Sequence, residues 1–177
     1  MTELQILDQV IERCFHLSLA GGKCVLSEAN ADCNRVEIEI SSKAFAFSLD
    51  GQGHLIKPFN SSEAGINKKN DGVLCFLHKQ KFYVFLLELK SGNKGQYLKQ
   101  LKSGKNFVEY LIQQINLFYP VNIQPEYRGV LFRLEKRSPQ KQTTRKTPPN
   151  FENRGGLLCV DLNCNQSYKL SQLKQAL

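Results

Sequence analysis

Residues 71–90 of the chain, DGVLCFLHKQKFYVFLLELK, decide the fold. Two apolar runs, 73–77 and 82–87, flank a polar segment of four residues, and this pattern predicts two strands joined by a hairpin loop. The second strand ends in a carboxylate and an amine two residues apart, Glu88 and Lys90. Because side chains alternate between the two faces of a strand, both are expected on the same face.

The hairpin register predicts a second carboxylate beside Glu88. If Leu77 pairs with Phe82 across the loop, counting outward along both strands puts Asp71 directly opposite Glu88. Opposed like charges on a sheet, with Cβ atoms about 5 Å apart, are destabilising unless a positive charge lies near them. A divalent cation close to Lys90 would supply that charge.

Each of these residues also has a plainer interpretation. Asn70-Asp71-Gly72 is a turn signature, because Asp and Gly favour chain reversal. Glu88 and Lys90 could be an ordinary ion pair where a strand reaches solvent. The functional hypothesis therefore depends on the conjunction of the three residues.

Asp71, then Glu88-Leu89-Lys90, then a predicted helix carrying Gln100, resembles the PD-(D/E)XK (restriction-endonuclease-like) nuclease superfamily. The similarity covers roughly residues 66–135. It implies an α/β fold with an αβββαβ core, in which helices flank a central mixed sheet. Gln100 matches the helix glutamine of the RecB-like branch, but Gly104 stands where that branch has tyrosine, so no subfamily is assigned.

The resemblance also implies roles for individual residues. Asp71 and Glu88 would bind Mg²⁺, for which Mn²⁺ could substitute, and the backbone carbonyl of Leu89 would be a third ligand. Lys90 would position or activate the attacking water, with Gln100 beside it in the catalytic set. Many members have a further acidic ligand on the first helix, for which the candidates are Glu12 and Glu63.

Basic residues predict a polyanionic partner. Lysines recur along the predicted helix after Lys90, and a basic segment at about 135–153, rich in Pro, Thr and Gln, is predicted to be a mobile loop. A solvated helix face and a disordered, solubilising loop are the alternatives. The residues expected to bind nucleic acid are Lys94, Lys99, Lys102, Arg133, Lys136 and Arg137.

Composition sets the broad class of protein. The 177 residues favour one domain, 1–177, and the net charge of +8 agrees with a nucleic-acid partner. The chain shows no signal-peptide pattern and no apolar stretch of about 20 residues, so a cytoplasmic protein without a membrane partner is expected. The six cysteines are then expected to be reduced thiols, and the spacing of Cys159 and Cys164 gives zinc little support.

Periodicity predicts the remaining elements. Both hairpin strands carry apolar side chains on their two faces, which suggests that helices cover both faces of the sheet. The expected elements are an opening helix at 3–18, neighbouring strands at 36–40 and 44–49, a long helix at 98–115, strands at 129–134 and 156–162, and a short final helix.

The expected function is metal-dependent phosphodiester hydrolysis, with DNA favoured over RNA and endonuclease over exonuclease. One rival is a nucleic-acid-binding module or accessory subunit of a DNA-processing or defence complex that keeps the fold without turnover. Another is a protein-interaction domain in which Asp71, Glu88 and Lys90 form a simple ion cluster. A protein partner or a homodimer is open in each case.

Overall fold

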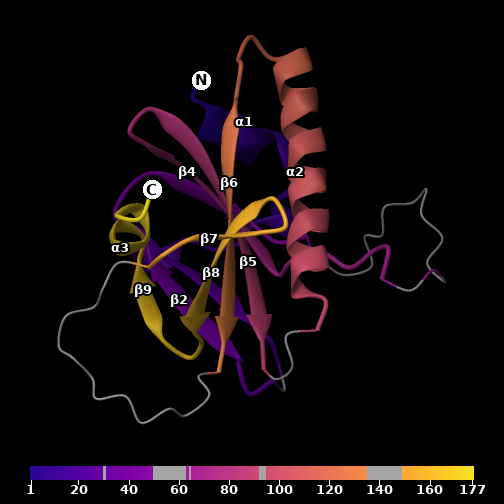
Figure 1. The fold of residues 1–177 in the computed structure, drawn as a ribbon. Helices are drawn as coiled ribbons and strands as arrows, with labels where there is room; N and C mark the ends of the chain where they lie inside the picture. The colour runs from indigo at the N-terminus through magenta and orange to yellow at the C-terminus, as the bar shows by residue number, and fades with distance from the viewer. Residues whose placement is uncertain (30, 50–62, 64, 92–94, 135–148) are drawn as a thin grey trace.

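The protein is a mixed α/β structure built on two β-sheets (Figure 1). The structure, a computed structural model, describes all residues except 30, 50–62, 64, 92–94 and 135–148. The large sheet has six strands in the order β3-β4-β5-β6-β8-β7, and the small sheet has three in the order β1-β2-β9. The predicted α/β class with a mixed sheet is confirmed at this level.

The large sheet contains both antiparallel and parallel pairs. β4 pairs antiparallel with β3 and β5, whereas β6 runs parallel to both β5 and β8. β7 closes the edge antiparallel to β8. The strands are β3 (Ala44–Phe47), β4 (Gly72–His78), β5 (Lys81–Lys90), β6 (Pro125–Arg133), β7 (Glu152–Arg154) and β8 (Leu157–Asn163).

The predicted hairpin is confirmed with its register. Leu77 pairs with Phe82, and Gly72 pairs with Leu87 at the other end of the ladder. Positive φ angles at Lys79 (47°) and Gln80 (62°) match a two-residue turn of the type that follows the strand twist. The loop is therefore tighter than four residues, because His78 and Lys81 also pair.

The two faces of the large sheet are covered differently. On one of them, the helical face, α1 (Glu3–Val10) and α2 (Tyr97–Phe118) bury leucine, valine and isoleucine side chains against Val73, Val84 and Leu86. The small sheet and α3 (Leu170–Lys174) cover the other face, as Figure 1 shows with α2 and α3 on opposite sides. The small sheet consists of β1 (Lys23–Ser27), β2 (Arg35–Glu39) and β9 (Ser167–Lys169). Helices therefore lie on both faces as predicted, but a second sheet shares one of them with α3.

One predicted strand pairing was wrong. The strand predicted at 36–40 is not a neighbour of the strand at 44–49: β2 belongs to the small sheet, while β3 pairs with β4 in the large one. The short strands β1, β7 and β9 carry little periodic signal and were not predicted. The final short helix and the long helix are confirmed as α3 and α2.

The opening helix is shorter than predicted. Helix α1 ends at Val10, and Arg13–Phe15 form a 3₁₀ turn. Beyond Val10 the chain is drawn to the edge of β3, where Leu17 donates to the Ala46 carbonyl and Ser48 donates to the Phe15 carbonyl. These backbone bonds satisfy an otherwise unpaired sheet edge, so tertiary pairing overrides the helical periodicity.

The basic loop predicted at about 135–153 lies largely outside the described residues. Where the chain is described again, Glu152 and Asn153 belong to β7, so the last two residues of the predicted loop form part of a strand. No helix in the described part of the chain is long and apolar enough to span a membrane.

Helix α2 packs against the start of β4 through one buried contact. Asn70 is fully buried, and its side-chain amide donates to the carbonyls of Gly72 (2.5 Å) and Leu87 (3.4 Å). A Cβ atom at Gly104 would lie 1.6 Å from Asn70 Oδ1. Only glycine therefore allows α2 to approach this closely, which accounts for glycine inside a helix.

Gly104→Ala is expected to lower the free energy of unfolding by about 1–3 kcal/mol, because overpacking outweighs the better helix propensity of alanine. In an Asn70→Ala background the same change should instead stabilise the protein by up to about 1 kcal/mol. Urea unfolding of the wild type, the two single variants and the double variant measures these changes. Ser103→Ala, at the residue before Gly104, is the control. Equal effects of Gly104→Ala in both backgrounds would show that Asn70 is not the obstacle.

Candidate functional site

Asp71 and Glu88 come together at the end of the hairpin. Extending the observed register by one residue beyond the last pair, Gly72 with Leu87, puts Asp71 opposite Glu88. The Leu89 amide donates to Asp71 Oδ2 at 2.6 Å, which ties the two strands directly. The predicted proximity of the two carboxylates is therefore borne out by the geometry, on the helical face of the sheet.

The Glu88 carboxyl is the most unusual group of the site. It is fully buried and forms an ion pair with Lys90, whose side chain is 24% exposed. Neither carboxyl oxygen has a hydrogen bond of ordinary geometry from the described residues. A buried carboxylate in such surroundings is costly, since burial disfavours its charged form.

The cost of burying the Glu88 carboxylate also appears in its pKa. The pKa of Glu88 is raised to about 8, chiefly by burial and then by the negative charge of Asp71, which together outweigh the lowering effects of Lys90 and the Asp71 backbone. Two carboxyls and one ammonium thus share a space that a single proton or another cation can balance. Perturbed carboxyls of this kind are frequent at functional sites, although structural ion clusters also produce them.

Gln100 and Asn70 support the chain just before Asp71. Gln100 Nε2 donates to the Lys69 carbonyl (3.3 Å), and Asn70 holds the carbonyls on both hairpin strands. Gln100 therefore reaches the backbone next to Asp71 from the first turns of α2. This contact fits a role for Gln100 in positioning the backbone before Asp71.

The donor atoms present can be compared with what Mg²⁺ requires. Asp71 and Glu88 offer hard carboxylate oxygens, the ligand type that Mg²⁺ prefers, and water commonly fills its remaining positions. Within the described ranges, no cluster of three or more His, Cys, Asp or Glu side chains gathers that could hold a metal. The buried Glu88 oxygens already contact one cation, the Lys90 ammonium at Oε1, so a metal ion would share this carboxylate with Lys90.

The two candidates for a further acidic ligand lie apart from this pair. Glu12 is exposed at the 3₁₀ turn after α1, where it accepts a weak hydrogen bond from Cys14. Glu63 is exposed and lines a pocket of about 340 Å³ together with Gln100 and Lys99. Glu63 is therefore on the Gln100 side of the site, whereas nothing in the structure links Glu12 to it.

The predicted nucleic-acid contacts divide into two groups. Lys94, Lys136 and Arg137 lie outside the described residues. The lysines of α2, although spaced by three, reach different neighbours. Lys99 lines the pocket that contains Gln100. The Lys102 amine lies against Gly155, 3.0 Å from where a Cβ atom of that residue would be. Lys105 pairs with Glu109 (3.1 Å).

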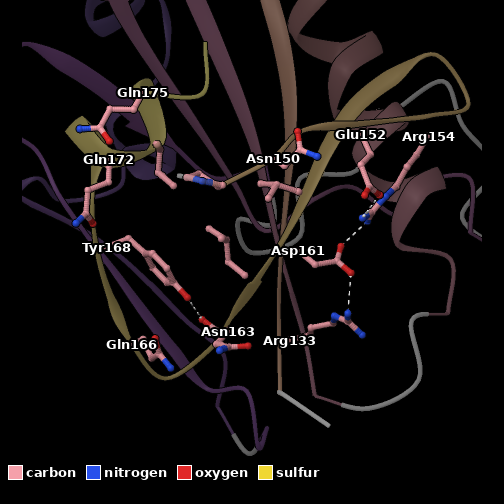
Figure 2. A pocket seen from close by; sticks show the side chains of 14 residues that line it. Arg133, Asn150, Glu152, Arg154, Asp161, Asn163, Gln166, Tyr168, Gln172 and Gln175 are labelled. Carbon is pink, nitrogen blue, oxygen red and sulfur yellow. Dashed lines mark hydrogen bonds and ion pairs between the residues drawn. The ribbon is translucent and has the colours of Figure 1, made fainter. Parts of the chain in front are cut away.

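Arg133 lies beside the site because β5 and β6 are parallel. Its Cα partner across the ladder is Lys90, so the two basic residues end neighbouring strands on one face. Arg133 pairs with Asp161 of β8 at 3.0 Å, and Asp161 also forms an ion pair with Arg154 of β7. Figure 2 shows the Asp161 carboxylate between the two guanidinium groups.

Sequence reasoning missed Asp161 and Arg154. Asp161 was predicted in the last strand without a role, yet it interrupts an apolar run just as Glu88 does, and that signal could have identified it. Nothing in the sequence points to Arg154, since β7 is short and its pairing with β8 is set by the fold.

Comparison of the chain with protein-family models, with curated proteins and with solved structures finds no match. The functional argument therefore rests on the residues and their geometry.

The raised pKa of Glu88 predicts a pH dependence of stability. Because the folded state holds a proton that the unfolded state loses above its ordinary pKa of 4.5, stability should fall as pH rises from about 4.5 to about 8. Glu88→Gln removes this effect. The free energy of unfolding of the variant should therefore rise relative to that of the wild type, by up to about 1.4 kcal/mol per pH unit across that window, and then level off.

Urea unfolding in EDTA from pH 5 to 9 tests this expectation. The control is Glu126→Gln, because Lys81 and Arg128 lower the pKa of Glu126 and its contribution is lost only as pH falls. A difference between Glu88→Gln and wild type that is constant with pH would mean that Glu88 is ionised normally in the folded protein.

Proposed function

We propose that this chain is a metal-dependent nuclease of the restriction-endonuclease-like type, which hydrolyses phosphodiester bonds, with DNA as the favoured substrate. The observation that carries the proposal is the buried Glu88 carboxyl opposite Asp71, with Lys90 on the same face and no ordinary hydrogen bond on its oxygens. A structural ion pair does not require two carboxyls at one buried strand end.

The order of elements supports the same proposal. With β1 and β2 set aside, which lie between α1 and β3 in the chain, α1, β3, β4, β5, α2 and β6 occur in αβββαβ order, and β6 is parallel to β5. In the family that the sequence resembles, the acidic and lysine residues lie at the equivalent hairpin. Residues 23–39 and 152–174 add the small sheet, β7, β8 and α3 around this succession.

The proposed roles follow from position. Asp71, Glu88 and the Leu89 carbonyl would hold Mg²⁺ or Mn²⁺, which when bound polarises the phosphate and lowers the pKa of a coordinated water. Lys90 would orient the water and stabilise charge that develops on the phosphate. Gln100 would keep the backbone before Asp71 in place through the Lys69 carbonyl.

The nucleic acid would approach from the helical face. Lys99 and Lys102 of α2 and Arg133, which pairs with Lys90, are proposed to contact its phosphates, and Lys94, Lys136 and Arg137 are proposed to add further phosphate contacts. An endonuclease with a protein partner or a second copy of the chain, located in the cytoplasm, completes the proposal. All six cysteines are free thiols, as a reducing compartment permits.

The second candidate is a non-catalytic nucleic-acid-binding or accessory subunit with this fold. The Lys90–Glu88 ion pair favours it, because an amine that neutralises Glu88 reduces the need for a metal. The two candidates differ in Mg²⁺ binding, which calorimetry measures on the intact chain with Glu88→Gln as the comparison.

Asp71→Asn, Glu88→Gln and Lys90→Met are each expected to lower metal-dependent cleavage by at least 100-fold, because each removes a group from the reacting centre. The assay uses labelled single- and double-stranded DNA and RNA with Mg²⁺, Mn²⁺ or EDTA. Circular dichroism checks that each variant is folded. Wild-type protein that binds nucleic acid but never cleaves it would favour the accessory subunit.

Lys99→Gln is expected to weaken binding to DNA several-fold and to reduce its salt dependence, because Lys99 is exposed beside Gln100. Lys105→Gln is the matched control, since its charge is already paired with Glu109. Binding measured by fluorescence anisotropy at several salt concentrations compares them. Equal losses in the two variants would indicate a general charge effect.

A further inference from the structure

A second polar pocket opens at the β7–β8 edge of the large sheet. Its volume is about 790 Å³, within the roughly 300–1,000 Å³ typical of small-molecule sites. Figure 2 shows Arg133 and Arg154 on one side of it and the side chains of α3 and β9 on the other. Asp71, Glu88, Lys90 and Gln100 do not line it, whereas Arg133, the neighbour of Lys90, does.

The arginine side of the pocket is pre-organised. Asp161 contacts both guanidinium groups, and Arg154 also reaches the Tyr97 hydroxyl at 3.4 Å. Each guanidinium has five N–H donors, so both retain donors after these contacts. A guanidinium held in place by a carboxylate loses little freedom on binding, and its fork geometry matches a phosphate.

One carboxylate competes for this side of the pocket. Glu152 pairs with Arg154 at 3.4 Å, but its side chain is 64% exposed, so this contact is weak. Asp161 is more buried and bridges both arginines. A phosphate can therefore displace Glu152 while Asp161 keeps the two guanidinium groups oriented.

The opposite side of the pocket presents side-chain amides. They are Gln166 before β9, Gln172 of α3 and Gln175 directly after α3, and Asn150, before β7, adds a fourth amide from the side of Glu152 (Figure 2). The structure gives these amides no hydrogen bond to another described side chain. Each offers both donors and an acceptor, the combination that recognises the edge of a nucleobase.

We infer that this pocket binds one nucleotide of the nucleic-acid strand, with its phosphate on Arg133 and Arg154 and its base against the amides of Asn150, Gln172 and Gln175. The pairing of Arg133 with Lys90 across the β5–β6 ladder places the arginine pair next to the proposed cleavage site. The inference rests on the proposed function for the identity of the strand, which would enter with an unpaired or displaced base.

Titration of the intact chain in EDTA with the four deoxynucleoside 5′-monophosphates, a nucleoside and inorganic phosphate tests the inference. A nucleotide should bind at least tenfold tighter than either the nucleoside or phosphate alone. Arg133→Gln should weaken nucleotide binding at least tenfold, and Gln175→Ala should weaken it while leaving phosphate binding unchanged. Glu152→Gln should strengthen it, because the competing carboxylate is removed.

Arg13→Gln is the matched control, since Arg13 is exposed near the β3 edge, at the other side of the sheet. Nucleotide binding no tighter than phosphate binding, or equal losses in Arg13→Gln and Arg133→Gln, would overturn the pocket. Glu88→Gln should keep nucleotide binding while losing cleavage. Nucleotide binding without any cleavage would therefore retain the pocket and reject the nuclease, and cleavage without nucleotide binding would do the reverse.

Discussion

The antiparallel register of β4 and β5 is the constraint on which the site depends. It sets Asp71 opposite Glu88, and the amide of Leu89 holds Asp71 there. A slip of one residue would turn Glu88 from the helical face to the face covered by the small sheet. Both faces are buried, so a slip would also move every apolar side chain of the hairpin, and the core therefore protects the geometry of the carboxyl pair.

Helix α2 connects the two halves of the candidate site. Its first turns bring Gln100 to the backbone before Asp71, and Gly104 allows it to lie against Asn70. The same helix is the crossover that makes β6 parallel to β5, so β6 ends in Arg133 beside Lys90. The packing of one helix thus affects both the carboxyl pair, Asp71 and Glu88, and the position of Arg133 next to Lys90.

Much of this could be predicted from local sequence. The turn signal between two apolar runs specified the hairpin and its register, and the apolar stripe specified α2. The helix at 3–18 and the pairing of 36–40 with 44–49 were wrong for a common reason. Periodicity reports which side chains are apolar, but it does not report which edge a backbone will pair with, and α1 yields to the edge of β3.

The sequence by itself determined the hairpin, the face that carries Glu88 and Lys90, and the proximity of Asp71, because a period of two and a short turn leave one register that buries the apolar residues. Only the tertiary structure decided that Glu88 is buried without ordinary hydrogen bonds, and that Asp161 joins Arg133 to Arg154. Both depend on strands that meet from distant parts of the chain, and no local pattern encodes which distant segments share a sheet.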